Sequence, residues 1–327
     1  MNREYREWFC YVLLGVVLFM AEFYFSPLFG VLFLISPLPF MLLQYRFGTR
    51  SAMYAALTAV LSIYLPDVFE HGMAGTVSQA NLVSVLMFVT LFVFPGMLFG
   101  TLARLQKSAA GWLLQATAAS LSAKIFLMVS LIASTGINPF AIDEAIATSV
   151  VSAAGSVANI GSVQAVKDYV QELAATMKML LPSMLILYAA ADSFCTYKAA
   201  EKLLKRKGKT LPAFIPFGEW RFPKELSTAV LAALLLKVSE YFAPSYAVTM
   251  ASENLMMVLR AVFTLEGMSV FWYLAGKNRI FKALRLSLLV FSILFLALFT
   301  YPYSFVGIVD IWYDLRRLGG KKNESNS

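Results

Sequence analysis

Charged side chains within long apolar stretches are the residues of this sequence best placed to do chemistry. A charge at the centre of a membrane helix costs about 2.5–3.5 kcal/mol, so each should face a partner, a cavity or the end of its helix. Carboxylates beside an ammonium or guanidinium group can bind a polar solute or an ion, or they can join two helices. The side chains concerned are Glu22, Lys124, Asp192, Lys237, Glu253, Arg260, Glu266 and Asp310.

The deeper charges, together with one amide, predict a substrate-binding cavity. Glu253 and Arg260 are seven residues apart, so they lie two turns apart on one face of a helix. In a structural alternative, a base such as Lys124 or Arg260 pairs with an acid and the pair only locks two helices together. Asp192 and Glu266 are the acids available for such a lock. The residues predicted to line the cavity are Asp192, Glu253, Asn254, Arg260 and Glu266.

The remaining inventory of side chains argues against an enzyme. The single histidine, His71, cannot form the H-E-x-x-H zinc motif, which needs two, and no G-x-S-x-G sequence accompanies it. No G-x-x-x-x-G-K-[ST] loop is present, so uphill transport would draw on an ion gradient or on a separate ATPase. We therefore expect no catalytic residues, no metal site and no cofactor.

The composition indicates the environment of these side chains. Hydrophobic residues make up 59% of the 327 positions and charged residues only 14%, against about 25% in a soluble domain. The chain lacks the polar surface that a soluble protein of this length needs, so we expect a lipid bilayer around it. The net charge of +8 gathers at the ends of apolar stretches instead of forming a basic stripe, which argues against a nucleic-acid partner.

The apolar stretches predict an all-α integral membrane protein, a polytopic helical bundle with nine to ten transmembrane segments. About 20 apolar residues span a bilayer, and nine stretches approach that length. Tyr303–Leu315 would add a short tenth segment, which Pro302 separates from the ninth, and we favour ten. The nine stretches are Trp8–Phe25, Pro27–Leu43, Thr49–Leu65, Leu82–Ala103, Ala109–Ala133, Met177–Tyr197, Leu226–Phe242, Thr249–Ala275 and Leu284–Thr300.

The distribution of basic residues predicts the orientation of the chain. Alternate connections hold most of the 27 lysine and arginine residues, and Arg316 and Arg317 in the tail belong to this set. The intervening connections hold acidic residues such as Asp67 and Glu70. Because basic residues accumulate on the cytoplasmic side, we expect a cell-membrane protein with its N-terminus and C-terminus in the cytoplasm.

Four regions follow from this topology. Residues 1–200 form a six-helix membrane unit that includes an external loop at 137–176. This loop is either an amphipathic helix on the outer face or a solvated cap over the bundle. Residues 201–224 form a basic cytoplasmic connection, residues 225–316 the C-terminal membrane helices, and residues 317–327 a disordered tail.

The interval 198–224 is basic at first and then turns apolar. Its basic half should extend the sixth helix into the cytoplasm until Pro212 ends that helix. A positive-inside topology signal is the simpler interpretation of these charges. The alternative is a docking site for an ATPase or a regulatory partner.

Small residues at helical spacing predict flat helix faces. Gly96 and Gly100 form one such face, and Ala52 and Ala56 form another. Such faces allow two backbones to approach closely. Packing within the chain is the default interpretation, and docking onto a separate membrane subunit is the alternative.

Several short motifs occur in order along the chain. They are Pro37-Leu38-Pro39, Arg46-Phe47-Gly48, Pro95-Gly96, Trp220-Arg221-Phe222-Pro223, Glu266-Gly267, and Gly307 with Asp310, Trp312, Asp314 and Arg316. In these motifs the chain resembles the YybS-like bacterial membrane proteins, a family of unknown function.

The resemblance implies a distant relation to the S components of energy-coupling-factor importers, which capture vitamins or metal ions. Those components dock onto a partner membrane subunit driven by two ATPases. The N-terminal half would then be S-component-like, and the three or four additional C-terminal segments depart from that pattern.

Two functions therefore compete at the level of sequence. In the first, the protein binds an unknown small-molecule solute in an interior cavity and takes part in its import. In the second, it is a non-transporting scaffold or regulator of other envelope proteins, with 198–224 and Asp310–Arg317 as its partner surface. A transporter should respond to a solute, and a scaffold should co-purify with proteins.

Overall fold

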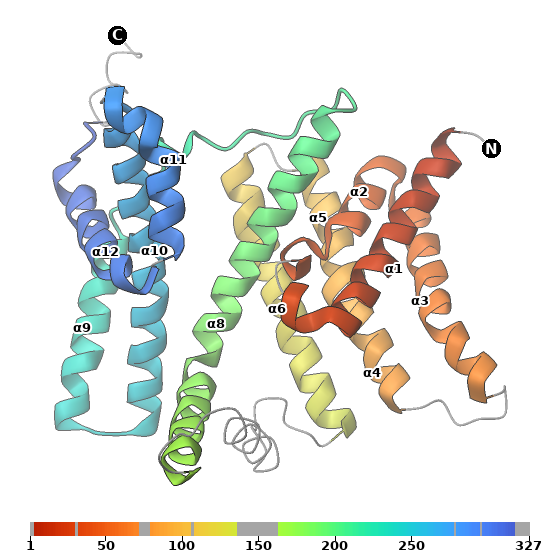
Figure 1. Cartoon of the computed structure of the whole chain (residues 1–327), viewed down its shortest axis with the longest axis horizontal. Coiled ribbons are helices and arrows are strands. Elements are labelled where there is room, and N and C mark those ends of the chain that lie inside the picture. Colours follow the sequence, from red (N-terminus) through yellow and green to blue (C-terminus); the bar gives the residue numbers. More distant parts are fainter. Residues whose placement is uncertain are drawn as a thin grey trace. The chain divides into compact units, whose positions relative to one another are not determined.

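The chain folds into two compact units, both built from helices in the part of the chain that the structure describes (Figure 1). Unit 1 comprises Met1–Ala174 and Leu185–Ala213, and unit 2 comprises Ala175–Met184 and Phe214–Ser327. The structure is a computed structural model. The residues that it describes are 3–29, 32–71, 79–105, 108–135, 163–277, 279–294 and 296–317.

Unit 1 packs around α2, a short helix in which every residue from Leu38 to Gln44 is buried. Its closest neighbour is α5, because Gly96 and Gly100 let the two backbones approach. A Cβ atom on Gly96 would lie 2.6 Å from the carbonyl oxygen of Pro37. The elements are α1 (Arg3–Phe29), η1 (Leu32–Ile35), α2 (Leu38–Phe47), α3 (Thr49–His71), α4 (Gln79–Phe88), η2 (Val89–Val93), α5 (Phe94–Leu105), α6 (Ala109–Thr135) and most of α8 (Val163–Lys205).

A π-helical turn, η2, joins α4 to α5 directly before Pro95. The N–H of Phe94 bonds to the carbonyl oxygen of Val89, five residues earlier, so the turn is wider than an α-helical one. Proline has no N–H and its ring crowds the preceding turn, which the wider turn relieves. The three elements thereby form one long apolar helix, Leu82–Leu105.

Unit 2 packs around α10, which contacts α9, α11, α12 and η3. Its tightest contact is with α12, where a Cβ atom on Gly267 would lie only 1.9 Å from the carbonyl oxygen of Tyr303. An apolar core joins α9, α10 and α12 through Ala233, Leu259, Phe263 and Ile311. The elements are η3 (Phe217–Glu219), α9 (Leu226–Phe242), α10 (Tyr246–Lys277), α11 (Arg279–Leu294) and α12 (Leu296–Tyr313).

Several helices are long and apolar enough to cross a membrane. In the described part of the chain there are four, and a fifth candidate is the pair α11 and α12, which is bent at its break. The four contain the predicted stretches Leu82–Ala103, Ala109–Ala133, Met177–Tyr197 and Thr249–Ala275. A helical membrane protein is therefore confirmed, and the count of nine to ten segments remains a prediction. The four are Leu82–Leu105, Ala109–Ser134, Asp168–Lys205 and Tyr246–Lys277.

Two predicted segments have the wrong boundaries. Pro27–Leu43 is not one segment, because α1 runs to Phe29 and α2 begins only at Leu38. Pro37 and Pro39 occupy the start of α2, where a missing N–H costs least. At the other end of the chain, Pro302 lies inside α12 and so does not separate two helices; α11 ends at Leu294 and α12 begins at Leu296. Helices in a membrane tolerate proline when neighbouring groups satisfy the freed carbonyl.

The end of α8 also differs from the prediction, because Gly208 ends this helix and not Pro212. Gly208 has a φ of +69°. Its N–H bonds to the carbonyl oxygen of Lys205, and the N–H of Lys209 bonds to that of Leu204. This pattern is a Schellman motif, which favours glycine because the left-handed conformation is strained for other residues.

Some predictions fall on residues outside the described ones. The predicted external loop is covered only from residue 163 onward, where α8 begins, and residues 136–162 lie outside the description. The tail from residue 318 and the side chain of Glu22 lie outside it as well.

Candidate functional site

Among the described residues of unit 2, a buried ionic cluster surrounds Arg316. The side chains of Arg316, Glu266 and Asp310 have no exposed surface. The Nε and Nη2 atoms of Arg316 donate to Oδ2 of Asp310 at 3.1 and 2.7 Å, and Nη2 also donates to Oε1 of Glu266 at 3.0 Å. A guanidinium group thus holds two carboxylates from two different helices.

The connection before α9 completes the cluster. The Nη1 atom of Arg316 donates to the carbonyl oxygen of Gly218 at 2.9 Å and to Oγ of Ser269 at 2.7 Å. The backbone N–H of Phe222 donates to Oε2 of Glu266 at 2.8 Å. Arg316 therefore ties the 217–222 connection to α10 and α12.

The crossing of α10 and α12 explains why these residues meet. Glu266 directly precedes Gly267, and Asp310 lies three residues after Gly307, on the facing helix. The chain then turns back after α12 at Asp314, which has a φ of +45°. This turn brings Arg316 back to the carboxylate of Asp310, six residues before it.

The charges of the Arg316 cluster do not balance. Two buried carboxylates face one guanidinium group, and the neighbouring pair of Arg221 and Asp314, at 3.3 Å, adds one charge of each sign. Both oxygens of Glu266 accept hydrogen bonds, whereas Oδ1 of Asp310 is buried and accepts none from the described residues. An unsatisfied ionised oxygen in such a place carries a large desolvation cost.

A second buried ionic cluster lies in unit 1 and joins α6 to α8. Lys124 forms an ion pair with Asp192, as the structural alternative in the sequence predicts, and its Nζ also donates to Ser120. Oδ2 of Asp192 accepts from Ser120 at 2.8 Å, and Oδ1 accepts from Ser193 at 3.2 Å. Here one acid balances one base, and each carboxylate oxygen has a donor.

The other residues predicted to line a cavity have different partners. Glu253 pairs with Lys237 of α9 at the partly exposed end of the α9–α10 hairpin. The guanidinium carbon of Arg260 lies 4.8 Å from the centre of the Tyr301 ring. Glu253 and Glu266 are thirteen residues apart, about 20 Å along one helix. The structure therefore does not gather the predicted residues of α10 around one small solute.

Asn254 binds the backbone of α8 beside Pro182. Its Nδ2 donates to the carbonyl oxygen of Met179 at 2.7 Å, and its Oδ1 accepts from the N–H of Ser183 at 2.8 Å. Met179 and Ser183 are four residues apart, so the amide bridges an i, i+4 pair of backbone groups next to the proline. This contact explains Asn254 through helix packing in unit 2.

The residues predicted to dock a partner lie within unit 1. Gly96 and Gly100 face α2, and a Cβ atom on Gly100 would lie 2.7 Å from the carbonyl oxygen of Met41. Ala52 is fully buried, and Ala56 is half-buried. The glycine face is thus occupied by a helix of the same chain, in agreement with the packing interpretation.

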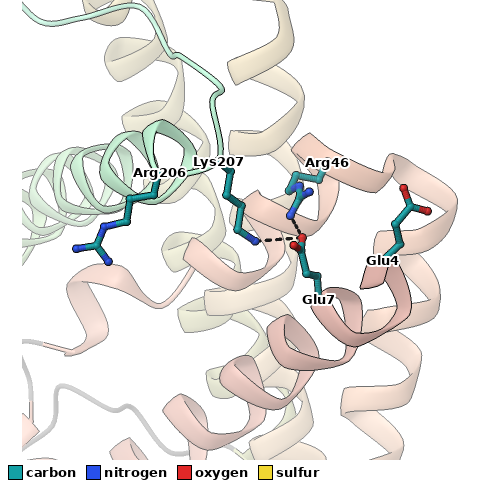
Figure 2. A pocket seen from close by; sticks show the side chains of 5 residues that line it. All are labelled: Glu4, Glu7, Arg46, Arg206 and Lys207. Atoms are coloured by element: carbon teal, nitrogen blue, oxygen red, sulfur yellow. Dashed lines mark ion pairs between the residues drawn. The ribbon is translucent and has the colours of Figure 1, made fainter. Parts of the chain in front are cut away.

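A cavity of about 260 Å³ lies in unit 1 at the start of α1 and the ends of α2 and α8, and none of the predicted cavity residues lines it. Figure 2 shows Arg46 and Lys207 directed at Glu7, whereas Arg206 points away from them. Lys207 lies 3.1 Å from the carboxylate of Glu7 and 2.9 Å from the hydroxyl of Tyr11. These ion pairs tie the end of α8 to α1 and α2.

Comparison with known protein families shows which family the chain belongs to. Residues 13–311 match the family described as "Predicted membrane protein (DUF2232)". The chain belongs to this family. The matched range includes Glu266, Ser269 and Asp310, and Arg316 lies five residues beyond it. Among curated proteins and among solved structures, no match was found.

Arg316 is the member of this site that sequence reasoning missed. Its position near the C-terminus assigned it to a basic cytoplasmic tail, yet its side chain is fully buried. One signal could have pointed to it. Glu266 and Asp310 are two acids in apolar stretches, so a base was needed near them, and Arg316 lies six residues after Asp310.

Proposed function

We propose that this membrane protein binds a small polar solute among its helices and takes part in moving it across the membrane. One observation carries the proposal, namely that each unit keeps a buried ionic cluster on helices of strongly apolar sequence. A buried ion pair is a weak source of stability, because desolvation offsets its Coulomb attraction. Charged groups inside membrane helices commonly belong to the paths of solutes and ions.

The finer topology belongs to the same proposal. It comprises a multi-pass bundle of nine to ten segments in the cell membrane, with both termini in the cytoplasm. The α9 helix, with 17 residues, reaches the lower end of the length that a span needs. The YybS-like motifs and the proposed S-component-like N-terminal half would provide docking for a separate membrane subunit and its ATPases. No enzymatic activity is part of this proposal.

A scaffold is the second candidate, and a specific observation favours it. Four of the five predicted cavity residues already have polar or ionic partners within the chain, namely Asp192, Glu253, Asn254 and Glu266. Under this alternative the two clusters only fix the helices, and other envelope proteins would bind to the surface of the bundle.

Replacing the ion pair of unit 1 by an apolar pair separates the two candidates. The variant combines Lys124→Met with Asp192→Leu, which keeps volume but removes both charges. Such replacements are often neutral or stabilising. Wild type and variant would be screened by thermal shift in detergent against vitamins, metal ions, nucleobases and amino acids.

For a transport component, at least one compound should raise the melting temperature of the wild type by several degrees. The stable double variant should lose this response, and uptake of the same compound into proteoliposomes should fall with it. A compound that shifts both proteins equally would place binding elsewhere. No shift with any compound, together with a double variant as stable as the wild type, would favour the scaffold.

A further inference from the structure

Arg260 differs from the other four predicted cavity residues, because no described acid pairs with it. Its guanidinium group contacts the ring of Tyr301, with 4.8 Å between the guanidinium carbon and the ring centre. Within the described part of the chain, its side-chain N–H donors have no oxygen acceptor. Arginine side chains are always protonated in proteins. Arg260 is therefore a cation that lacks a counterion among the described residues.

Arg260 also lies deep in a helix that is long and apolar enough to cross a membrane. It follows the start of α10 by 14 residues and precedes the end of this helix by 17. These separations correspond to about 20–25 Å along the helix axis. Long basic side chains reach the membrane surface only from positions near a helix end. A charge at the depth of Arg260 should therefore face a partner or a cavity.

The acids on the helices of unit 2 are already paired with bases. Neither α11 nor the part of α8 that belongs to unit 2, Ala175–Met184, contains an acid. The acids of α9, α10 and α12 form these pairs: Glu240 and Glu253 with Lys237, and Glu266 and Asp310 with Arg316. The helices of unit 2 therefore do not supply the counterion of Arg260.

The α12 helix holds both the backbone and the side chain of Arg260. The carbonyl oxygen of Arg260 accepts from Oγ of Ser304 at 3.1 Å and from Oγ1 of Thr264 at 2.7 Å. Tyr301, whose ring contacts the guanidinium group, lies three residues before Ser304 on the same helix. A guanidinium group that is already positioned loses less entropy when it binds a ligand.

Arg260 lies between two helix contacts of α10 and remains half-exposed there. Met257 and Thr264 are its neighbours on the helix surface, three residues before it and four after it. Met257 contacts Ser183 of α8, and Thr264 contacts Ser304 of α12. The guanidinium group is therefore on the strip of α10 between these two contacts, and it is open to a ligand.

The chemistry of this strip selects the kind of ligand. The planar fork of a guanidinium group matches the two oxygens of a carboxylate or a phosphate. A single positive charge balances one negative charge, whereas a doubly charged phosphate would leave an excess charge in an apolar setting. The adjacent side chains of Met256, Met257 and Phe263 are apolar. A singly charged carboxylate with an apolar remainder fits best.

We propose that Arg260, held by Tyr301, is an anion-binding site of unit 2 that takes the carboxylate group of a small organic monoanion. This site does not use the Lys124–Asp192 pair of unit 1. It does not require transport either, and a scaffold would have the same site. Bound anion would supply the counterion that the helices of unit 2 do not.

Thermal unfolding of the full-length protein in detergent tests this site. Sodium acetate, butyrate and benzoate would each be compared with sodium chloride at the same concentration. At least one carboxylate should raise the melting temperature of the wild type by several degrees. Benzamide, which resembles benzoate without its charge, should have no effect. No response of the wild type to any of the three carboxylates would overturn the proposal.

Arg260→Gln should fold, because no acid loses its base, and it should lose the response to carboxylates. Arg285→Gln is the matched control. Arg285 contacts a ring in the same way, 4.5 Å from the centre of Trp272, but lies only six residues after the start of α11. This control should keep the response. A response that survives in Arg260→Gln, or that disappears in both variants, would overturn the proposal.

Chemical modification of the wild type keeps the site testable if Arg260→Gln does not fold. Phenylglyoxal reacts with accessible arginine side chains, and mass spectrometry locates the modified residue. We expect Arg260 to react in sodium chloride and to be protected by the carboxylate that raises the melting temperature. Failure of Arg260 to react in chloride, or equal reaction in both salts, would overturn the proposal.

The variant that combines Lys124→Met with Asp192→Leu separates this site from the solute function proposed above. Both changes lie in unit 1, so the double variant should keep the response to carboxylates. Loss of that response would assign the anion to the unit 1 pair and overturn a site at Arg260, while the solute function would stand. A response that is kept, without any response to the wider screen of solutes, would reject the solute function alone.

Discussion

The two buried ionic clusters differ in how their charges balance. In unit 1, Lys124 and Asp192 form a pair of equal and opposite charges, and two serines satisfy the remaining oxygen atoms. In unit 2, Arg316 holds two acids, and one oxygen of Asp310 has no donor in the described residues. The first cluster is therefore neutral and fully hydrogen-bonded, whereas the second carries one negative charge in excess.

The largest expected effect comes from Arg316→Met. This change leaves two carboxylates buried together without a base, so we expect a loss of at least about 3–5 kcal/mol of stability. Most of the protein should aggregate on extraction, which size-exclusion chromatography in detergent would measure. Arg317→Met, at the exposed neighbouring position, is the control and should behave like the wild type.

Lys124→Met should be the next most severe change, because it leaves one buried carboxylate, that of Asp192, without a base, whereas Arg316→Met leaves two. We expect about 3–5 kcal/mol of destabilisation, and almost complete recovery when Asp192→Leu is added. In unit 2, adding Asp310→Asn to Arg316→Met should recover only part of the loss, because Glu266 remains unpaired. Melting temperatures of the single and double variants would measure both recoveries. Equal recovery in the two units would contradict the difference in charge balance.

Gly267→Ala tests whether the second cluster depends on the α10–α12 crossing. The new methyl group would collide with the backbone of Tyr303, and we expect a loss of about 1–3 kcal/mol in a thermal unfolding assay. Gly276→Ala is the control on the same helix, since its nearest neighbour is the flexible end of Arg285 at 3.3 Å. Similar melting temperatures for the two variants would show that the crossing is looser than described.

The smallest effect is expected for Asn254→Ala, which affects neither cluster directly. It removes the bridge to Met179 and Ser183, and we expect a loss of about 1 kcal/mol. Glu253→Ala, at the adjacent position, removes a partly exposed ion pair and should cost less. Hydrogen exchange of the Ser183 amide should rise only in Asn254→Ala. Unchanged exchange would contradict the bridging role.

Much of the fold could be predicted from the sequence because apolar length and charge are local properties. The stretches around residues 82–103, 109–133, 177–197 and 249–275 lie in helices long enough to cross a membrane. The predicted helix boundaries at Pro212 and Pro302 were wrong, and the reason is again local. Proline limits a helix only where no other feature acts first, and Gly208 ends α8 before Pro212 is reached.

The candidate site was less predictable, because it depends on contacts between distant segments. Asp192 and Glu266 were identified as buried acids, and the pairing of Asp192 with Lys124 was among the alternatives. The burial of Arg316 was not predicted, because a basic residue near the C-terminus is expected to be exposed to solvent. Nothing in its local sequence indicates that the chain folds back after Asp314.

By itself, the sequence determined the environment of this protein and the kind of element it uses. A chain with few charged residues is stable in a bilayer as long apolar helices, because each helix satisfies its own backbone hydrogen bonds however the helices are arranged. Only the tertiary structure decided which charges meet. The close crossing at Gly267 and Gly307 places Glu266 and Asp310 near each other, and the turn at Asp314 brings Arg316 between them. Electrostatic energy depends on the distances between these charges. Those distances are fixed by segments that lie far apart in the sequence.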